Sequence, residues 1–157
     1  MLNLLEALTN RLTTQRKFRH TAERHSRSYQ CRCGTAIFFR NTQCLNCKSP
    51  LGYLPETLSL VALNPGPDPE TVCPDGSDRL YKYCANRQTS ALCNWLVEAS
   101  DPNPLCITCR LNRTIPDLND PDIARYWGEI EAAKRRLVSH FLRAAPRGAC
   151  QRERTER

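Results

Sequence analysis

The sequence predicts a small β fold stabilised by metal, followed by one long C-terminal α-helix, with basic tails that we expect to be disordered. Three observations carry this prediction. The 157 residues include 10 cysteines, and most of these fall into close groups. Only 7% of the residues are aromatic and 11 are prolines, so crosslinks by metal or disulfide are needed where a large hydrophobic core is lacking. A capped stretch with helical periodicity begins at residue 120.

The first cysteine group has the spacing of a tetrahedral zinc site. Two close pairs are separated by ten residues, and the four predicted ligands are Cys31, Cys33, Cys44 and Cys47. Gly34 follows the first pair, at a position where a turn around thiolates often needs a positive φ. We therefore predict a first unit of the zinc-ribbon type over residues 29–63. The alternative is a pair of disulfides or four unrelated thiols.

Strand patterns surround this group. Residues 36–40 are expected to run as a strand from one cysteine turn to the other, and residues 57–63 alternate as a second strand. Phe38 and Phe39 are expected to cover the metal turns and to supply most of the core of the first unit.

A proline- and acid-rich segment over residues 64–79 is the clearest internal linker. It contains Cys73, which we interpret as a spare thiol. A second unit of the zinc-ribbon type is predicted over residues 80–118, with Trp95 and Val97 in its core. By spacing its ligands are Cys84, Cys93, Cys106 and Cys109, of which only the last two form a close pair, and Cys73 could replace Cys84 or Cys93.

An amphipathic helix is predicted over residues 120–143. Asp120 suits the N-cap, and Pro121 suits the first helical position. Its apolar face is wider than two small units can cover, so part of it is expected to dock onto a protein partner or another domain, or to self-associate. The residues expected at this surface are Trp127, Ile130 and Phe141, and the whole face comprises Ile123, Trp127, Ile130, Leu137 and Phe141.

The net charge of +7 comes from the two ends of the chain. Residues 1–28 are basic and expected to be mostly disordered, apart from a possible short helix at 2–12, and residues 144–157 form a basic tail. Residues 31–133 carry nine basic and twelve acidic side chains. Because a nucleic-acid-binding ribbon normally carries positive charge itself, this balance argues against that function.

No secretory signal and no apolar run long enough to span a membrane are visible. We therefore expect a cytoplasmic location. A reducing compartment favours metal binding over disulfides, and two Zn²⁺ ions per chain are predicted.

Several motifs together resemble the amino-terminal region of a family of bacterial zinc-binding metallopeptidases. They lie between residues 29 and 143 and include Leu51-Gly52-Tyr53, Cys93-Asn94-Trp95 and the run from Cys106 to Leu118. The resemblance implies a cysteine-rich zinc-ribbon region joined to a zincin-like domain with a His-Glu-x-x-His motif, and it supports Cys84 and Cys93 as ligands. This sequence has no such motif.

We therefore expect no enzymatic activity, because the metal-binding histidines and the general base of a zincin are missing. The predicted function is that of a zinc-binding scaffold or protein-interaction unit. Two alternatives stay open. One is a nucleic-acid-binding zinc ribbon, and the other is a rubredoxin-like iron protein, because four thiolates also accept iron.

Overall fold

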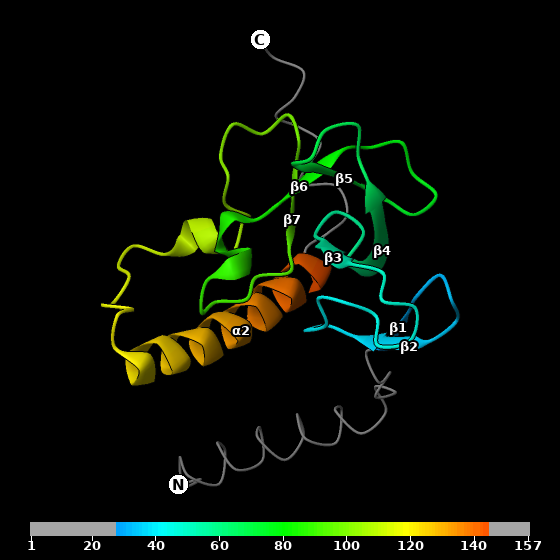
Figure 1. Cartoon of the computed structure of the whole chain (residues 1–157). Helices are drawn as coiled ribbons and strands as arrows, with labels where there is room; N and C mark the ends of the chain where they lie inside the picture. The colour runs from blue at the N-terminus through cyan, green and yellow to red at the C-terminus, as the bar shows by residue number, and fades with distance from the viewer. Residues whose placement is uncertain (1–27, 145–157) are drawn as a thin grey trace, which may run out of the picture.

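The computed structural model describes residues 28–144 (Figure 1). A hairpin of β1 (Ser28–Gln30) and β2 (Ala36–Phe38) forms its own two-stranded sheet and packs beside a five-stranded antiparallel sheet of order β3-β4-β5-β6-β7. The sheet consists of β3 (Leu51–Leu54), β4 (Ser59–Pro65), β5 (Thr71–Pro74), β6 (Tyr81–Tyr83) and β7 (Leu96–Glu98). The 3₁₀ turns η1 (Ala85–Gln88) and η2 (Cys109–Leu111) precede the helix α2 (Pro121–Ala144). The expected helix at 2–12, the C-terminal tail and Cys150 lie outside the described residues.

The two ends of the five-stranded sheet meet. Tyr53 in β3 donates its backbone N–H to the Asn94 carbonyl at 2.7 Å, and Tyr53 forms a parallel bridge with Trp95, just before β7. Because β3 and β7 are the first and last strands of the order, this contact curls the sheet onto itself. The Tyr53 ring lies 4.6 Å from the Trp95 ring and 4.9 Å from the Phe39 ring, so these aromatic side chains fill the interior where the ends join.

The segment over residues 64–79 is not the plain linker that the sequence suggested. Its central residues form β5, which pairs with β4 on one side and with β6 on the other. Prolines and acidic residues dominate both ends of this segment, so its composition does not indicate the four-residue strand between them. Val72 of this strand is buried. The sheet therefore runs without interruption from the first predicted unit into the second.

The hydrophobic core is shared between the two predicted units. One cluster contains Ile37 and Leu51 from the first unit together with Trp95 and Val97 from the second, so the expected burial of Trp95 and Val97 is confirmed. The expectation for Phe38 is wrong, because this side chain is 57% exposed. Successive side chains of a strand point to opposite faces, and β2 turns Ile37 inward and Phe38 outward.

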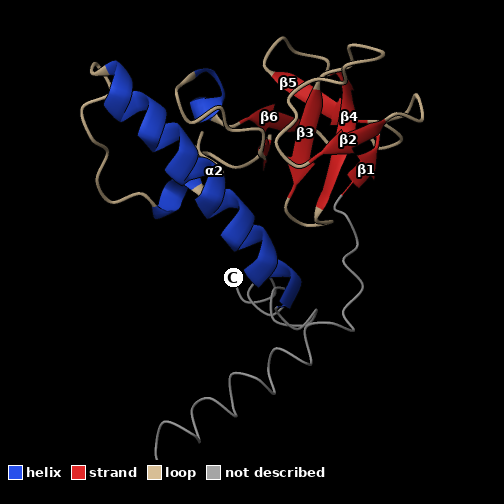
Figure 2. Ribbon diagram, turned by 90° about the horizontal axis from the view of Figure 1, so that it is seen from below, coloured by secondary structure: helices blue, strands red, loops and turns tan. Residues whose placement is uncertain are grey.

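α2 begins as the sequence predicts. The Asp120 carboxylate accepts the N–H groups of Asp122 at 2.9 Å and Ile123 at 3.3 Å, which satisfies two of the free donors at the helix start. In Figure 2, α2 runs along one side of the strands.

The face of α2 that packs against the rest of the protein is not its most apolar face. The buried side chains are Glu131, Ala132, Arg135 and Ser139, and Val138 and Leu142 are partly buried against the core. Trp127, which was expected at the docking surface, is only partly exposed. The rest of the predicted apolar face points outward instead, with exposed fractions of 38% at Ile123, 58% at Ile130, 55% at Leu137 and 65% at Phe141, and so does Tyr126 at 54%. We call these five residues the apolar stripe.

Polar contacts hold the inner face of α2 in place. The hydroxyls of Ser139 and Tyr53 lie 2.8 Å apart in the interior, and Arg135 donates to the Ala91 carbonyl at 2.8 Å. Glu131 is spaced to pair with Arg135 one turn later in the helix. It pairs instead with Lys134 at 2.5 Å, because Arg135 is directed at the backbone of the loop before Cys93.

Candidate metal centres

The first centre brings together the four cysteines of the first group. Their sulfur atoms all lie within 4.8 Å of one another, with Cys31 and Cys47 at 3.6 Å and Cys33 and Cys44 at 3.7 Å. A tetrahedral zinc ion with Zn–S bonds of about 2.3 Å places its sulfurs about 3.8 Å apart, whereas a disulfide needs about 2.05 Å. These separations fit a metal ion and not a disulfide.

Tight turns aim these sulfurs inward. Gly34 adopts φ 83°, as its position after the first pair predicts, and donates its N–H to the Cys31 carbonyl at 2.8 Å. In the second turn Lys48 donates to the Cys44 carbonyl at 3.0 Å and itself has φ 58°. A non-glycine residue in the left-handed region is uncommon, so the turn around Cys44 and Cys47 is held in shape by its surroundings.

The first centre is open to solvent on one side. Cys31 and Cys44 are buried, whereas Cys33 and Cys47 are exposed. Burial raises the pKa of Cys31 to about 12, and the contact with the Thr35 hydroxyl lowers the pKa of Cys33 to about 5. Thiolates, not thiols, bind metal, so the lowered pKa of Cys33 favours the form of this side chain that binds metal.

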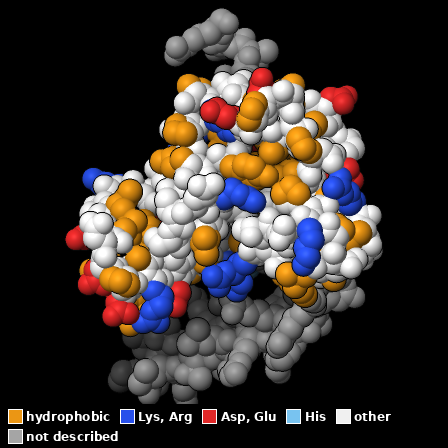
Figure 3. Space-filling model, in the orientation of Figure 1, with side chains coloured by type: hydrophobic (Ala, Val, Ile, Leu, Met, Phe, Trp, Pro, Cys, Tyr) orange, Lys and Arg blue, Asp and Glu red, His pale blue; other side chains and the backbone are white. Residues whose placement is uncertain are grey.

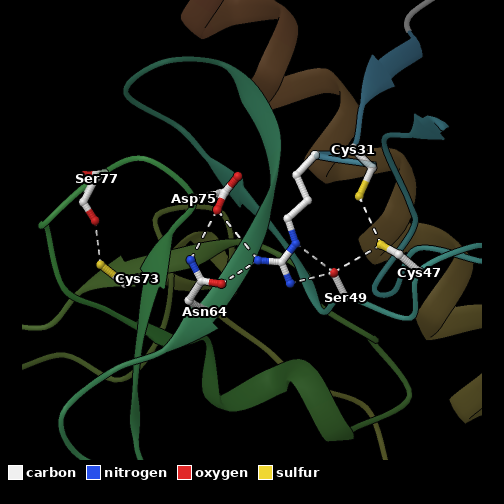
Figure 4. A network of polar contacts seen from close by, with 8 residues as sticks. Cys31, Cys47, Ser49, Asn64, Cys73, Asp75 and Ser77 are labelled. Atoms are coloured by element: carbon white, nitrogen blue, oxygen red, sulfur yellow. Dashed lines mark hydrogen bonds and ion pairs between the residues drawn. The ribbon is translucent and has the colours of Figure 1, made fainter. Parts of the chain in front are cut away.

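A polar network anchors the first centre to the sheet (Figure 4). Ser49 Oγ lies 3.1 Å from Cys47 Sγ and accepts a hydrogen bond from Arg32 Nη2 at 2.8 Å. The same guanidinium donates to Asn64 Oδ1 at 2.5 Å and forms an ion pair with Asp75 at 3.6 Å. Arg32 stands between two ligands in the sequence, so this network fixes the first turn against β4 and the end of β5. The spacing of the cysteines gave no sign of it.

The second centre is fully buried. Its four sulfurs also lie within 4.8 Å of one another and come from Cys84, Cys93, Cys106 and Cys109. Cys93 and Cys106 are 3.6 Å apart, and the Cys106 N–H points at Cys84 Sγ at 3.4 Å. Hydrogen bonds among the thiols raise the pKa of Cys93, with Cys106 as the main partner, and lower the pKa of Cys106, with Cys109 as the main partner.

α2 contributes a charged pair beside the second centre. Glu131 is completely buried and its Oε2 lies 4.0 Å from Cys109 Sγ, while Lys134 holds its other oxygen at 2.5 Å. Four thiolates around one divalent ion carry a net charge of −2, so a neighbouring carboxylate needs a cation to offset it. Lys134 supplies that cation. The cysteine pattern did not predict this role, and the only signal in the sequence was the spacing of three residues between Glu131 and Lys134 on one helix.

The two centres are physically connected. Asn94, next to Cys93, donates its side-chain amide to the carbonyls of Phe39 at 2.7 Å and Asn41 at 3.1 Å. Arg87, in η1 after Cys84, reaches the carbonyls of Leu51 at 3.4 Å and Thr42 at 3.3 Å. Residues beside the second centre therefore hold the backbone between the two cysteine pairs of the first centre and the start of β3.

The remaining cysteine of the described part of the chain lies outside both groups. Cys73 Sγ donates to the Ser77 carbonyl at 2.6 Å (Figure 4). All nine described cysteines are free thiols, so the disulfide alternative finds no support among residues 28–144. The eight predicted ligands are the eight residues that the structure brings together.

This arrangement provides two four-cysteine metal-binding sites within one small β domain. Four thiolates in a tetrahedron suit Zn²⁺ or iron and leave no coordination position for a water molecule. Such closed sites stabilise a fold, because the free energy of metal binding adds to the free energy of folding.

A surface depression of about 390 Å³ lies between β2 and α2, away from the cysteine groups. It is lined by Phe38, Phe39, Arg40, Arg136 and His140. No helix within residues 28–144 has the length and hydropathy that crossing a membrane requires.

A family model described as a zinc-ribbon domain matches residues 28–120, which include both four-cysteine groups. Uncharacterized proteins of Mycobacterium tuberculosis and Mycobacterium bovis are 35% identical to the chain over 117 residues. The match covers 73% of the chain and 30% of each relative, so the chain spans less than a third of the length of these curated relatives. No solved structure matches the chain.

Proposed function

Because the chain belongs to the zinc-ribbon domain family, we propose that it is a zinc-binding, non-catalytic scaffold that docks onto a protein partner through α2. The observation that carries this proposal is the outward orientation of the apolar stripe. Ile130 is 58% exposed and Phe141 is 65% exposed, although the opposite face of the same helix is fixed to the core. Monomeric proteins rarely leave a continuous apolar face of this kind in water, and such faces usually bind other proteins.

Zinc is the metal that we assign to both centres. Sulfur separations of 3.6 to 3.7 Å fit Zn–S bonds, and the family is named for zinc. Elemental analysis of the chelator-washed protein is expected to give close to two zinc ions per chain. Iron is the alternative metal. If the purified protein shows the colour of a ferric tetrathiolate, the metal is iron and the zinc assignment is wrong.

A structural role for both metals supports the non-catalytic function. A hydrolytic zinc site needs an open position for water and a carboxylate that can take its proton. Both centres use four thiolates, and Glu131, the carboxylate near the second, is paired with Lys134. Zinc-loaded protein should therefore leave casein intact, and chelator-sensitive cleavage that survives purification would contradict this.

The partner that we propose is a peptidase-like domain of the kind that the sequence resemblance implies. Two facts support it. The apolar stripe lies on the last described element, and the mycobacterial relatives extend far beyond the matched region. In such proteins the stripe would be covered by the remainder of the polypeptide.

This docking can be tested with the part of the Mycobacterium tuberculosis relative that lies outside the match, added as a separate polypeptide. Zinc-loaded chain and this fragment should co-elute as a complex in size-exclusion chromatography with light scattering. Ile130→Ser should weaken the complex at least tenfold, whereas Leu111→Ser, which changes an exposed residue of η2, should not. A folded fragment that never binds, or binds the Ile130→Ser variant equally well, would contradict the proposal.

One observation favours nucleic-acid binding as a second candidate function. The exposed Phe38 ring stands beside Arg40 and Arg136 in the depression between β2 and α2, and aromatic rings with arginines bind single strands by stacking and charge. The net charge of −2 on each four-thiolate zinc centre opposes a polyanion. Fluorescence anisotropy with labelled oligonucleotides should show no binding at physiological salt. Binding that Phe38→Ala removes would favour the second candidate.

A further inference from the structure

One edge of the apolar stripe carries a regular pattern of charge. Four charged residues of α2 are spaced seven positions apart. The first two, Asp122 and Glu129, are acidic, and the last two, Arg136 and Arg143, are basic. An α-helix turns by about 100° per residue, so a step of seven residues returns to within about 20° of the same direction. The four charges therefore form a single row along α2.

This row has a fixed relation to the apolar stripe. Ile123, Ile130 and Leu137 also recur every seven residues, and each follows one of the charged residues directly. In heptad terms the apolar residues occupy a positions and the charged residues occupy the neighbouring g positions. Side chains at g positions border the contact between two paired helices and select the partner and its direction.

The two central charges are free to pair outside the chain. Among the described residues, neither Glu129 nor Arg136 takes part in a hydrogen bond or ion pair, whereas Glu131 is held by Lys134 and Asp122 by Arg125 at 3.6 Å. Arg136 lines the depression beside Arg40, where two guanidinium groups attract an anion. Figure 3 shows the acidic side chains gathered at the lower left, over the N-terminal turns of α2.

We propose that the occupant of the apolar stripe is a second copy of this chain, paired antiparallel through α2. The proposal rests on the docking function assigned to this face, and it names the partner that covers the apolar stripe when no peptidase-like domain is bound there. In an antiparallel pair g positions face g positions. Glu129 would then lie opposite Arg136 of the second copy, and Asp122 opposite its Arg143. Two-fold symmetry repeats each pair, so four ion pairs border one apolar seam.

The charge pattern also disfavours the opposite arrangement. In a parallel dimer g positions face e positions, so Asp122 would face Trp127 and Arg136 would face Phe141, and neither charge would gain a partner of opposite sign. Glu129 would face Lys134, which Glu131 already holds, so the row favours the antiparallel direction. The two centres of each copy stay on the outer side of the pair, because they lie behind the opposite face of α2.

Charge reversal gives a direct test by sedimentation equilibrium of the zinc-loaded full chain. The unmodified protein should form a dimer, and Glu129→Arg and Arg136→Glu should each weaken it about tenfold at low salt, because exposed pairs contribute only modestly. An equimolar mixture of the two variants should recover the dimer, since each supplies the charge that the other needs. The double variant Glu129→Arg, Arg136→Glu should recover it as well. Arg113→Glu, which lies outside α2, is the matched control.

These experiments test the antiparallel dimer and the proposed docking onto another domain independently of each other. A chain that stays monomeric at all concentrations overturns the dimer, while the mixing experiment with the mycobacterial fragment tests docking independently. If Glu129→Arg and Arg136→Glu both still form the dimer, and Ile130→Ser does not, the antiparallel register is wrong. Oligonucleotide binding through Arg136 in place of dimerisation also overturns the proposal. Circular dichroism of each variant confirms that the fold is retained, which is expected because Ile130 is exposed.

Discussion

The two cysteine groups differ in how much solvent reaches their sulfur atoms. Cys33 and Cys47 lie at the surface of the first centre, whereas the ligands of the second are all buried. Metal exchange begins with attack on an accessible metal–sulfur bond, and buried thiolates can be reached only after local unfolding. The two metals should therefore leave the protein at different rates.

We expect a chelator to remove the zinc of the first centre before that of the second. When the time course of zinc release is recorded with a colorimetric zinc indicator, it should show two phases of equal amplitude. Alkylation with mass spectrometry at the end of the fast phase should label Cys33 and Cys47 and leave Cys93 unlabelled. A single phase, or early labelling of Cys93, would contradict the asymmetry.

Ligand and non-ligand cysteines should respond differently to the same substitution. Cys44→Ser should remove one zinc ion per chain and cost several kcal/mol of folding free energy, since a structural zinc contributes on the order of 10 kcal/mol. Cys73→Ser is the matched control, because Cys73 lies in β5 outside both groups. Metal content and thermal unfolding measure the effect. Equal loss of metal in both variants would reassign the ligands.

At the scale of the element, α2 shows what sequence periodicity can and cannot predict. Its start and its length follow from the cap at Asp120 and the helical spacing. Ile130 and Phe141 are exposed as expected, whereas Trp127 is only partly exposed. Its packing face could not be predicted, because that face buries Glu131 and Arg135, which find partners only in the folded protein. β5 was missed for a related reason, since its pairing with β4 and β6 outweighs the prolines around it.

Gly128 marks a close approach of α2 to the loop before Cys93. A Cβ atom at this position would lie 2.5 Å from the Ser90 carbonyl oxygen, which is backbone and cannot move aside easily. Alanine stabilises an exposed helix position by about 1 kcal/mol relative to glycine. We expect the opposite sign for Gly128→Ala, with a lower Tm and faster zinc release. Arg125→Ala is the control on the exposed face, and a higher Tm in Gly128→Ala would contradict this packing.

At the scale of the whole molecule, the two predicted units behave as one. The curled sheet, the shared core and the Asn94 amide join the centres, although the sequence suggested separate units with a linker. Cysteine spacing reports only which sulfurs share a metal ion. It does not report contacts such as those of Asn94 with Phe39, which are 55 positions apart in the chain.

Unfolding should accordingly be cooperative across both centres. Asn94→Ala leaves buried carbonyls at Phe39 and Asn41 without their donor, which costs roughly 1–3 kcal/mol. It should accelerate zinc release from the first centre, although Asn94 is adjacent to a ligand of the second. Tm and release kinetics measure this, and Asn119→Ala, at an exposed position away from both centres, is the control. Normal release from the first centre in Asn94→Ala would show that the centres are independent.

The hydroxyl contact between Tyr53 and Ser139 spans 86 positions of the chain. During synthesis all eight ligand cysteines are made before Ser139, so metal capture can begin before α2 is complete. The nascent domain then carries its zinc without the helix that covers the loop before Cys93. The contact between Tyr53 and Ser139 can therefore close only after all eight ligands have been synthesised, so the metal centres can assemble before the helix that packs against them is in place.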